Sequence, residues 1–121
     1  MHLGNINGTI LIVIQEYLSE DGRSPFGQWF AELDPQAAAI VTVAVGRLGD
    51  GNTSNVKPIG EGASELRIDR GPGYRVYFGW DGRALVILLG GGTKRRQQND
   101  IEAALRHWRD YKRRKGARRK G

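Results

Sequence analysis

Three short segments with strand patterns follow one another in the second half of the chain, and their connections are too short to hold a helix. Apolar and polar residues alternate in Glu65–Asp69 and in Tyr74–Phe78, which is typical of strands with one buried face. Ala84–Leu89 is apolar throughout, which favours a strand covered on both faces at the centre of a sheet. Gly71–Gly73 and Asp81–Gly82 supply turn residues. The pattern therefore predicts a three-stranded antiparallel meander.

Two helix starts precede this meander. Ser24-Pro25 and Asp34-Pro35 each place a helix-capping residue directly before a proline, which suits the first helical position. Apolar residues follow each start at helical spacing: Phe26, Trp29, Phe30 and Leu33, then Ala37, Ile40, Val41, Ala44, Val45 and Leu48. The sequence therefore predicts a helix hairpin with almost no linker.

One further strand and one further helix complete the pattern. Thr9–Ile14 is rich in β-branched residues and predicts a buried strand. Helical spacing of Gln98, Ile101, Ala104, Leu105 and Trp108, of which all but Gln98 are apolar, indicates an amphipathic helix to about Arg113. The order β-α-α-β-β-β-α predicts an α+β fold, with the helix hairpin packed on a small, mainly antiparallel sheet. Gly90–Gly92 is expected to end the last strand of the meander.

The length of 121 residues suits a single domain, 1–121, with its core at 9–111 and a basic tail at 112–121. No apolar run approaches the ~18 residues of a membrane span, and no basic region precedes the first apolar run as in a secretory signal. The absence of cysteine excludes disulfides and thiol chemistry and fits a reducing compartment. A cytoplasmic protein without a membrane partner is expected.

Positive charge is concentrated at the C-terminal end. Residues 94–121 hold twelve Lys and Arg against three acidic residues, whereas the first 93 residues hold seven bases and ten acids. Such asymmetry is typical of a terminal region that meets an anion, which could belong to a nucleic acid, an acidic protein or a membrane surface. The alternative for the final stretch is a solvated tail.

Most catalytic motifs are absent from the sequence. No cysteine, His-x-Glu or paired-histidine motif offers a metal site, so neither a metal nor a cofactor is expected. The run Gly90–Lys94 follows a strand and opens a helix, as phosphate-binding loops do. Thr93 and Arg95 break the pattern of such loops on both sides of the lysine, which excludes a nucleoside-triphosphate loop.

A basic and aromatic face remains as the candidate site. Alternation turns Arg67, Arg75 and Tyr77 outward on neighbouring strands, because residues two apart share a face. Lys94–Arg96 stands at a helix N-terminus, where cations oppose the helix dipole at a cost of up to ~1 kcal/mol. A bound phosphate or a partner's carboxylate would offset that cost. The alternative is a solvated face on which Arg67 pairs with a carboxylate of its own strand.

Four runs of the sequence resemble the addiction-module killer proteins, which are HigB-like members of the RelE/ParE toxin superfamily. They are Asn55–Gly62, Glu65–Asp69, Gly71–Phe78 and Leu88–Lys94, within a likeness that covers about 10–111. The resemblance implies two helices packed on a strongly curved sheet. It implies a metal-independent endoribonuclease that cleaves messenger RNA, often at the ribosome, through the 2′-hydroxyl of the RNA. It also implies a cognate antitoxin, usually of helix-turn-helix type, and contact with operator DNA through the antitoxin complex.

The resemblance also implies roles for single residues. Arg75 resembles the strand arginine of RelE-type toxins. Arg67 lies near a basic position of the preceding strand, and Lys94 or Arg95 lies near the basic group after the last strand. Tyr77 is added because it shares a face with Arg75, as a residue that stacks on a base or donates its hydroxyl. The expected catalytic residues are Arg67, Arg75, Tyr77 and Lys94. The expected RNA-binding residues are Lys57, Arg95, Arg96, Arg118 and Arg119.

The last helix departs from the RelE pattern. RelE-type nucleases commonly carry a tyrosine or histidine early in this helix, whereas residues 95–106 offer only Gln97, Gln98 and Asp100 as candidates. The general base is therefore not identified. Two alternatives to RNA cleavage stay open: a ParE-type inhibitor of DNA gyrase, and a homologue that binds its antitoxin or DNA without catalysis.

Overall fold

The computed structural model describes residues 2–3 and 11–120, with the backbone alone at 2–3 and 119–120. The elements in chain order are β1 (His2–Leu3), β2 (Val13–Glu16), α1 (Pro25–Ala31), α2 (Pro35–Gly49), β3 (Val56–Gly60), β4 (Ala63–Ile68), β5 (Tyr74–Asp81), β6 (Leu85–Thr93), the 3-10 helix η1 (Lys94–Arg96) and α3 (Gln97–Lys120). The predicted order is contained in this series, and the fold is mixed α+β, as expected.

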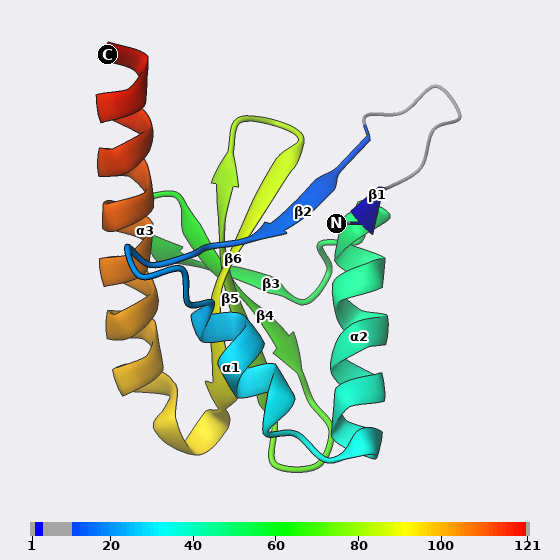
Figure 1. The fold of residues 1–121 in the computed structure, drawn as a ribbon. Coiled ribbons are helices and arrows are strands. Elements are labelled where there is room, and N and C mark those ends of the chain that lie inside the picture. The colour runs from blue at the N-terminus through cyan, green and yellow to red at the C-terminus, as the bar shows by residue number, and fades with distance from the viewer. Residues whose placement is uncertain (1, 4–10, 121) are drawn as a thin grey trace.

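The strands form one sheet in the order β1-β2-β6-β5-β4-β3 (Figure 1). β4, β5 and β6 pair antiparallel as the predicted meander, and β2 lies parallel to β6. The apolar strand β6 is therefore central, as predicted. Val56–Gly60, for which the sequence predicted no strand, pairs with β4 as the strand β3. Pro58 argues against a strand when only the sequence is known. The strand forms because β3 lies at the edge of the sheet, where a proline is tolerated.

The helix hairpin begins where the capping residues predict. The Ser24 side chain accepts a hydrogen bond from the Gly27 amide at 2.8 Å, and the Asp34 side chain accepts one from the Ala37 amide at 2.8 Å. Each cap satisfies one of the backbone donors that a helix start leaves open. The local sequence therefore determines where each of the two helices begins.

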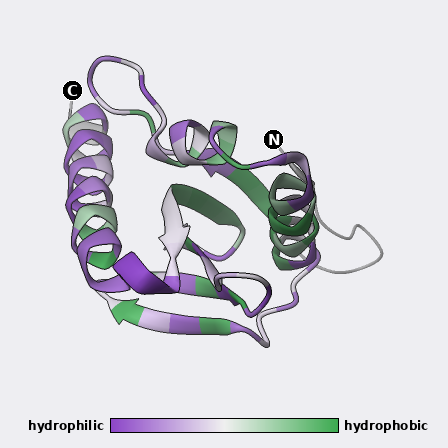
Figure 2. Cartoon of the chain, turned by 90° about the horizontal axis from the view of Figure 1, so that it is seen from below, coloured by the Kyte–Doolittle hydropathy of each residue, from purple (hydrophilic) through white to green (hydrophobic). Residues whose placement is uncertain are grey.

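Helices cover both faces of the sheet (Figure 1, Figure 2). Under α1 and α2 lies an apolar core of Ile12, Ile14, Phe26, Val41, Leu48, Leu66, Ile68, Val76, Phe78, Val86 and Leu88. Under α3 lies a second core of Tyr17, Ala63, Tyr77, Ile87, Leu89, Ala104 and Trp108. Tyr74 packs against the first core together with Val76 and Phe78, which confirms the predicted inward set of β5. The other face of β5 was expected to be exposed, and this is wrong because α3 covers it.

The glycine cluster of β6 is not a turn. Gly90, Gly91 and Gly92 continue the strand and pair with Tyr77, Val76 and Arg75 of β5. A Cβ atom at Gly91 would lie 2.1 Å from the Trp29 ring, and one at Gly92 would lie 2.0 Å from the Asp100 carboxylate. Glycine is therefore needed here for the close approach of a side chain on each face, which is its other use in strands.

Both ends of the predicted core differ from the observed elements. The strand predicted at 9–14 is observed at Val13–Glu16, and residues 9 and 10 lie outside the described part. The last helix does not end near Arg113 but continues through the basic tail to Lys120. The tail lacks an apolar stripe, but as the continuation of a packed helix it needs no new helix nucleus.

Candidate nucleic-acid interface

The predicted site residues gather on the α3-facing side of the sheet. In the strand register Lys57 of β3, Glu65 of β4 and Tyr77 of β5 form one row, and Arg67 of β4 lies opposite Arg75 of β5 in the next row. These side chains share a face, because the two rows are two residues apart along β4. The sheet thus brings together the strand residues that the sequence singled out, and the start of α3 lies over them.

Glu65 connects the sheet to the start of α3. Its carboxylate is 2% exposed and accepts hydrogen bonds from the Arg67 Nε at 2.8 Å and from the Gln97 Nε2 at 2.8 and 2.9 Å. A buried carboxylate is tolerated only when it is hydrogen-bonded and paired, and here both conditions are met. The Glu65 pairing confirms that Arg67 binds a carboxylate of its own strand. The importance of Glu65 was missed, because alternation alone assigned it to a solvated face.

Arg75 is buried rather than exposed. The residue is 4% exposed, its Nη1 donates to the Tyr74 carbonyl at 3.0 Å, and the same nitrogen lies 3.5 Å from the Asp69 carboxylate. Its Nε has no hydrogen-bond partner among the described residues. The turn residue Gly73 lies beside both the Arg75 guanidinium and the Lys94 side chain. A buried cation with an open donor is thus held just beneath the exposed lysine.

Tyr77 lies in the second core and is fully buried. Its hydroxyl has no hydrogen-bond partner within the described part of the chain, and burial, followed by the nearby Glu65 carboxylate, raises the pKa of this phenol. The prediction of an exposed ring that stacks on a base is therefore wrong. The physical reason is α3, which covers this row of the sheet and which strand alternation cannot foresee.

The basic group after β6 is exposed at the rim of this cluster. Lys94, Arg95 and Arg96 form η1, and all three side chains are exposed. The backbone amide of Lys94 donates to the Gly73 carbonyl at 2.7 Å, which fixes η1 beside the β4–β5 turn. The Thr93 side chain makes no capping hydrogen bond there. This end of the helix therefore presents open positive charge.

Asp100 lies in the first turn of α3, against Gly92. Burial raises the pKa of its carboxyl, and the cation of Arg96 opposes that shift. A carboxylate in the first turn also interacts favourably with the helix dipole, which offsets part of the cost of the cations in η1. The compensating anion predicted for this helix start is thus supplied in part by the chain itself. Gln98, by contrast, is exposed and bonds to Glu102 at 3.4 Å.

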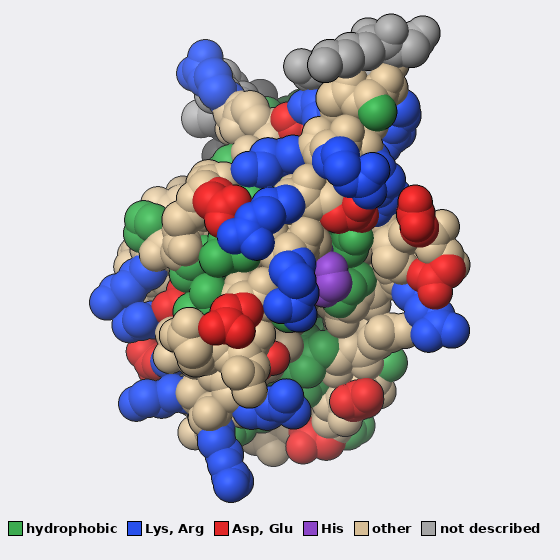
Figure 3. Space-filling model, turned by 90° about the vertical axis from the view of Figure 1, so that its left-hand side faces the viewer, with side chains coloured by type: hydrophobic (Ala, Val, Ile, Leu, Met, Phe, Trp, Pro, Cys, Tyr) green, Lys and Arg blue, Asp and Glu red, His purple; other side chains and the backbone are tan. Residues whose placement is uncertain are grey.

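The remaining predicted RNA-binding residues are dispersed. Lys57 is exposed on the edge strand β3, in the same row as Glu65. Arg118 is exposed near the far end of α3, roughly 30 Å along the helix from Gln97. The side chain of Arg119 lies outside the described part. Figure 3, which views the molecule from the α3 side, shows Lys and Arg spread over the whole face with Asp and Glu between them.

Several cations of α3 are paired within the chain. Arg109 binds Glu61, both Arg113 and Arg114 bind Asp110, and Lys115 binds Asp81. The Tyr17 hydroxyl also donates to Asp110 at 2.6 Å, and the His107 ring stacks on Tyr17 with centroids 5.0 Å apart. The positive charge of the C-terminal quarter therefore partly serves to attach α3 to the sheet and its loops. At η1, by contrast, Lys94 and Arg95 make no ion pair within the described part of the chain, and Arg96 acts on the Asp100 carboxyl.

The fold and the site define a small α+β protein with a cationic end at the junction of β5, β6 and α3. In the described part, no helix is long and apolar enough to cross a bilayer, and no three side chains form a potential metal-ligating cluster. Residues 28–109 match the family of phage-derived Gp49-like proteins (DUF891). The chain is 42% identical over 80 residues to an uncharacterized protein of Haemophilus influenzae, an overlap of 65% of this chain and 81% of the relative. The chain thus belongs to the Gp49-like family.

Proposed function

We propose that this Gp49-like protein is the toxin of a type II toxin-antitoxin module and acts as a metal-independent endoribonuclease of the RelE/ParE superfamily. One observation carries the proposal: Arg67 and Arg75 lie opposite each other on β4 and β5, and the Arg75 guanidinium and Lys94 both lie beside Gly73. Asp100 lies against Gly92, the β6 residue that pairs with Arg75. Attack of an RNA 2′-hydroxyl on its own phosphate breaks the bond from phosphorus to the 5′-oxygen of the next nucleotide and leaves a 2′,3′-cyclic phosphate. The step needs cations around the phosphate, an acceptor for the 2′-hydroxyl proton and a donor for the leaving 5′-oxygen. In this set Asp100 would accept the first proton and the Lys94 ammonium would supply the second. The resemblance of the strand motifs to HigB-like toxins supports the same reading.

The roles follow from exposure and charge. Lys94 and Arg95, which are exposed, would bind the RNA phosphate first, and Arg67 borders the same cluster. Asp100 is the best-placed proton acceptor, because burial raises its pKa toward the range useful for a general base. Glu65 is a poorer base, since Arg67 and Gln97 already bind both its oxygens. Arg75 would reach the phosphate only after η1 moves away from the β4–β5 turn.

Gyrase inhibition is the second candidate, and the burial of Arg75 and Tyr77 is the observation that favours it. An inhibitor needs no accessible cleavage site, and the exposed cations of η1 would still offer a binding surface. A homologue that binds only an antitoxin or DNA would have the same appearance. The proposed antitoxin, its operator complex and the ribosome are partners to be tested with the activity itself.

The test is induced expression with a growth readout, RNA 5′-end mapping and a gyrase supercoiling assay of the purified protein. New RNA 5′-ends with growth arrest are expected, and Lys94→Ala combined with Arg95→Ala should lower cleavage by about 10²-fold. Arg106→Ala, an exposed arginine farther along α3, is the matched control and should leave cleavage unchanged. Asp100→Asn should abolish cleavage while the protein stays folded.

Other outcomes separate the candidates. Loss of supercoiling without new RNA ends would replace the nuclease with a gyrase inhibitor. Normal growth at high soluble expression, with neither activity, would refute a toxin. Full cleavage by Asp100→Asn would remove Asp100 from the mechanism while keeping the nuclease.

A further inference from the structure

The outward face of α2 is unusual for a helix on a protein surface. The fifteen residues of α2 include one charged side chain, Arg47, whereas a solvated helix face normally carries several charges. Ala39, Thr42 and Val43 point outward, and Val43 is 52% exposed. Figure 2 shows α2 as an almost continuous apolar helix, in contrast to the polar α3. An exposed apolar strip of this kind is typical of a surface that binds another chain.

Shallow hollows border this strip on both sides. On the β4 side a hollow of about 280 Å³ is lined mainly by apolar groups, which include Ile40, Val43 and Ile68. On the α1 side a second hollow of about 200 Å³ lies between Phe30 and Val45. The exposed Val43 lines the first hollow and its neighbour Thr42 lines the second, and each hollow is of a size that accepts one or two apolar side chains. A flat or convex face would offer no such anchor points.

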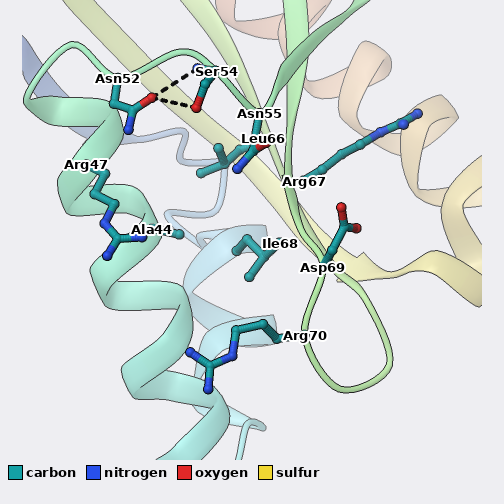
Figure 4. A pocket seen from close by; sticks show the side chains of 10 residues that line it. All are labelled: Ala44, Arg47, Asn52, Ser54, Asn55, Leu66, Arg67, Ile68, Asp69 and Arg70. Carbon is teal, nitrogen blue, oxygen red and sulfur yellow. Dashed lines mark hydrogen bonds between the residues drawn. The ribbon is translucent and has the colours of Figure 1, made fainter.

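Two arginines frame the hollow on the β4 side. Arg47 comes from α2, and Arg70 follows β4. Figure 4 draws the adjoining hollow, which both arginines and Asp69 also line, and it shows the Arg70 side chain directed toward α2. Both are exposed, and neither side chain makes an ion pair or hydrogen bond with the residues that the structure describes. Among the residues that the structure describes, no Asp or Glu lines this hollow. An apolar depression is thus bordered by two cations that lack an anion.

We propose that α2 and the end of β4 form a docking surface for an amphipathic helix of a partner protein, one that carries Asp or Glu beside its apolar stripe. The apolar stripe would fill the hollows beside Val43, and its acidic border would pair with Arg47 and Arg70. A second copy of this chain fits less well, because a symmetric contact through this face would bring the like charges of two copies together. Only the identity of the partner as the antitoxin rests on the proposed function; the surface itself does not.

The test uses two synthetic helical peptides of about 20 residues, which share a Leu/Ala stripe and differ in having Glu or Lys along its borders. Binding to the full-length chain is followed by amide chemical shifts. The Glu peptide should shift residues of α2 and of 66–70. In the double variant Arg47→Glu/Arg70→Glu its affinity should fall at least about tenfold, and the Lys peptide should bind instead. Val43→Asp should weaken binding of the Glu peptide as well.

The charge-matched control is Arg106→Glu/Arg118→Glu on α3, where both arginines are exposed. It should keep wild-type affinity for the Glu peptide. Equal losses in the two double variants, shifts centred on α3, or no binding would each overturn the docking surface. Amide shifts of α2 that change with protein concentration in the absence of peptide would show that this face binds a second copy of the chain. That result would overturn the proposal of an acidic partner. These readouts involve neither growth nor RNA, so a failure of the proposed toxin activity is recorded separately.

Discussion

The two faces of the sheet are built from different chemistry. The face under α1 and α2 buries mainly apolar side chains, with Val76 and Phe78 fully buried at its centre and the small polar Ser64 opposite Phe78. The face under α3 buries apolar residues toward the middle of the helix, but a carboxylate, a guanidinium and a phenol near its start. The first arrangement stabilises the fold through the hydrophobic effect, and its apolar side chains carry no group that could bind an ion or transfer a proton. The second buries polar and charged groups, which cost stability unless they are paired, and it is the face to which the proposed function is assigned.

The largest effect should come from opening the apolar face. Phe78→Ala removes a fully buried ring of the first core and should lower the free energy of unfolding by about 3–5 kcal/mol. Chemical denaturation measures this. Val43→Ala, at an exposed position, is the control and should cost no more than ~0.5 kcal/mol. A loss below ~1 kcal/mol for Phe78→Ala would mean that this face is not the main source of stability.

A smaller loss of stability is expected from substitutions on either face, because on each face a tryptophan ring packs directly against a glycine. A Cβ atom at Gly91 would lie 2.1 Å from the Trp29 ring, and one at Gly79 would lie 2.6 Å from the Trp108 ring. Alanine at either position should destabilise the protein by about 1–3 kcal/mol and change the tryptophan fluorescence. Gly90→Ala is the control, since no atom lies within 4 Å of its Cβ position. Equal stability of all three variants would contradict tight seating of the rings.

Acid should weaken the α3 face selectively. The hydrogen bond from Tyr17, with those from Arg113 and Arg114, lowers the pKa of Asp110 to about 2 from 3.8. A lowered pKa in the folded state gives stability that is present above the unfolded value and is lost as the pH falls from about 4 toward 2. Because Asp110 is near the surface, we expect it to contribute no more than ~1 kcal/mol to the free energy of unfolding.

Hydrogen exchange of α3 amides, compared with those of β5, measures this acid sensitivity. Asp110→Asn should remove it and leave the amides under α1 and α2 unchanged. The same loss of α3 protection in acid for wild type and Asp110→Asn would exclude this carboxylate as its cause.

The smallest expected effect is a gain, not a loss, in the free energy of unfolding. Tyr77→Phe removes a buried hydroxyl that has no partner among the described residues, so it should be neutral or stabilising by up to ~1 kcal/mol. Tyr17→Phe is the comparison, because its hydroxyl donates to Asp110 at 2.6 Å, and it should cost about 1 kcal/mol. Thermal unfolding of both variants tests the difference. Destabilisation by Tyr77→Phe equal to that of Tyr17→Phe would show that the Tyr77 hydroxyl is satisfied.

Local signals predicted the parts of the fold that depend on neighbouring residues. The caps Ser24 and Asp34 mark the helix starts, and alternation gives β4 and β5 with their inward residues. The edge strand β3 was missed, because Pro58 argues against a strand unless the strand is known to lie at an edge. Gly90–Gly92 was misread for a similar reason, since a glycine for a turn and a glycine for close packing look alike in a sequence.

The sequence predicted which candidate residues lie close together better than it predicted which of them are exposed. Arg67, Arg75 and Lys94 do lie together, as strand pairing and the resemblance implied. Tyr77 does not face solvent, and Glu65 and Asp100 gain their importance only from the start of α3. Alternation reports that two residues share a face, but not whether a helix from a distant part of the chain covers that face.

The sequence by itself determined the order of the predicted elements, the starts of α1 and α2, the meander and the concentration of basic residues in the last quarter, because each depends on contacts within a few residues or on composition. Tertiary structure alone decided that α3 lies over the second face of the sheet. That placement buries Arg75 and Tyr77, ties Glu65 to Gln97 and pairs several α3 cations with distant carboxylates. The physical reason is that burial and pairing of charges depend on which surfaces meet in space, and those surfaces are separated here by tens of residues along the chain.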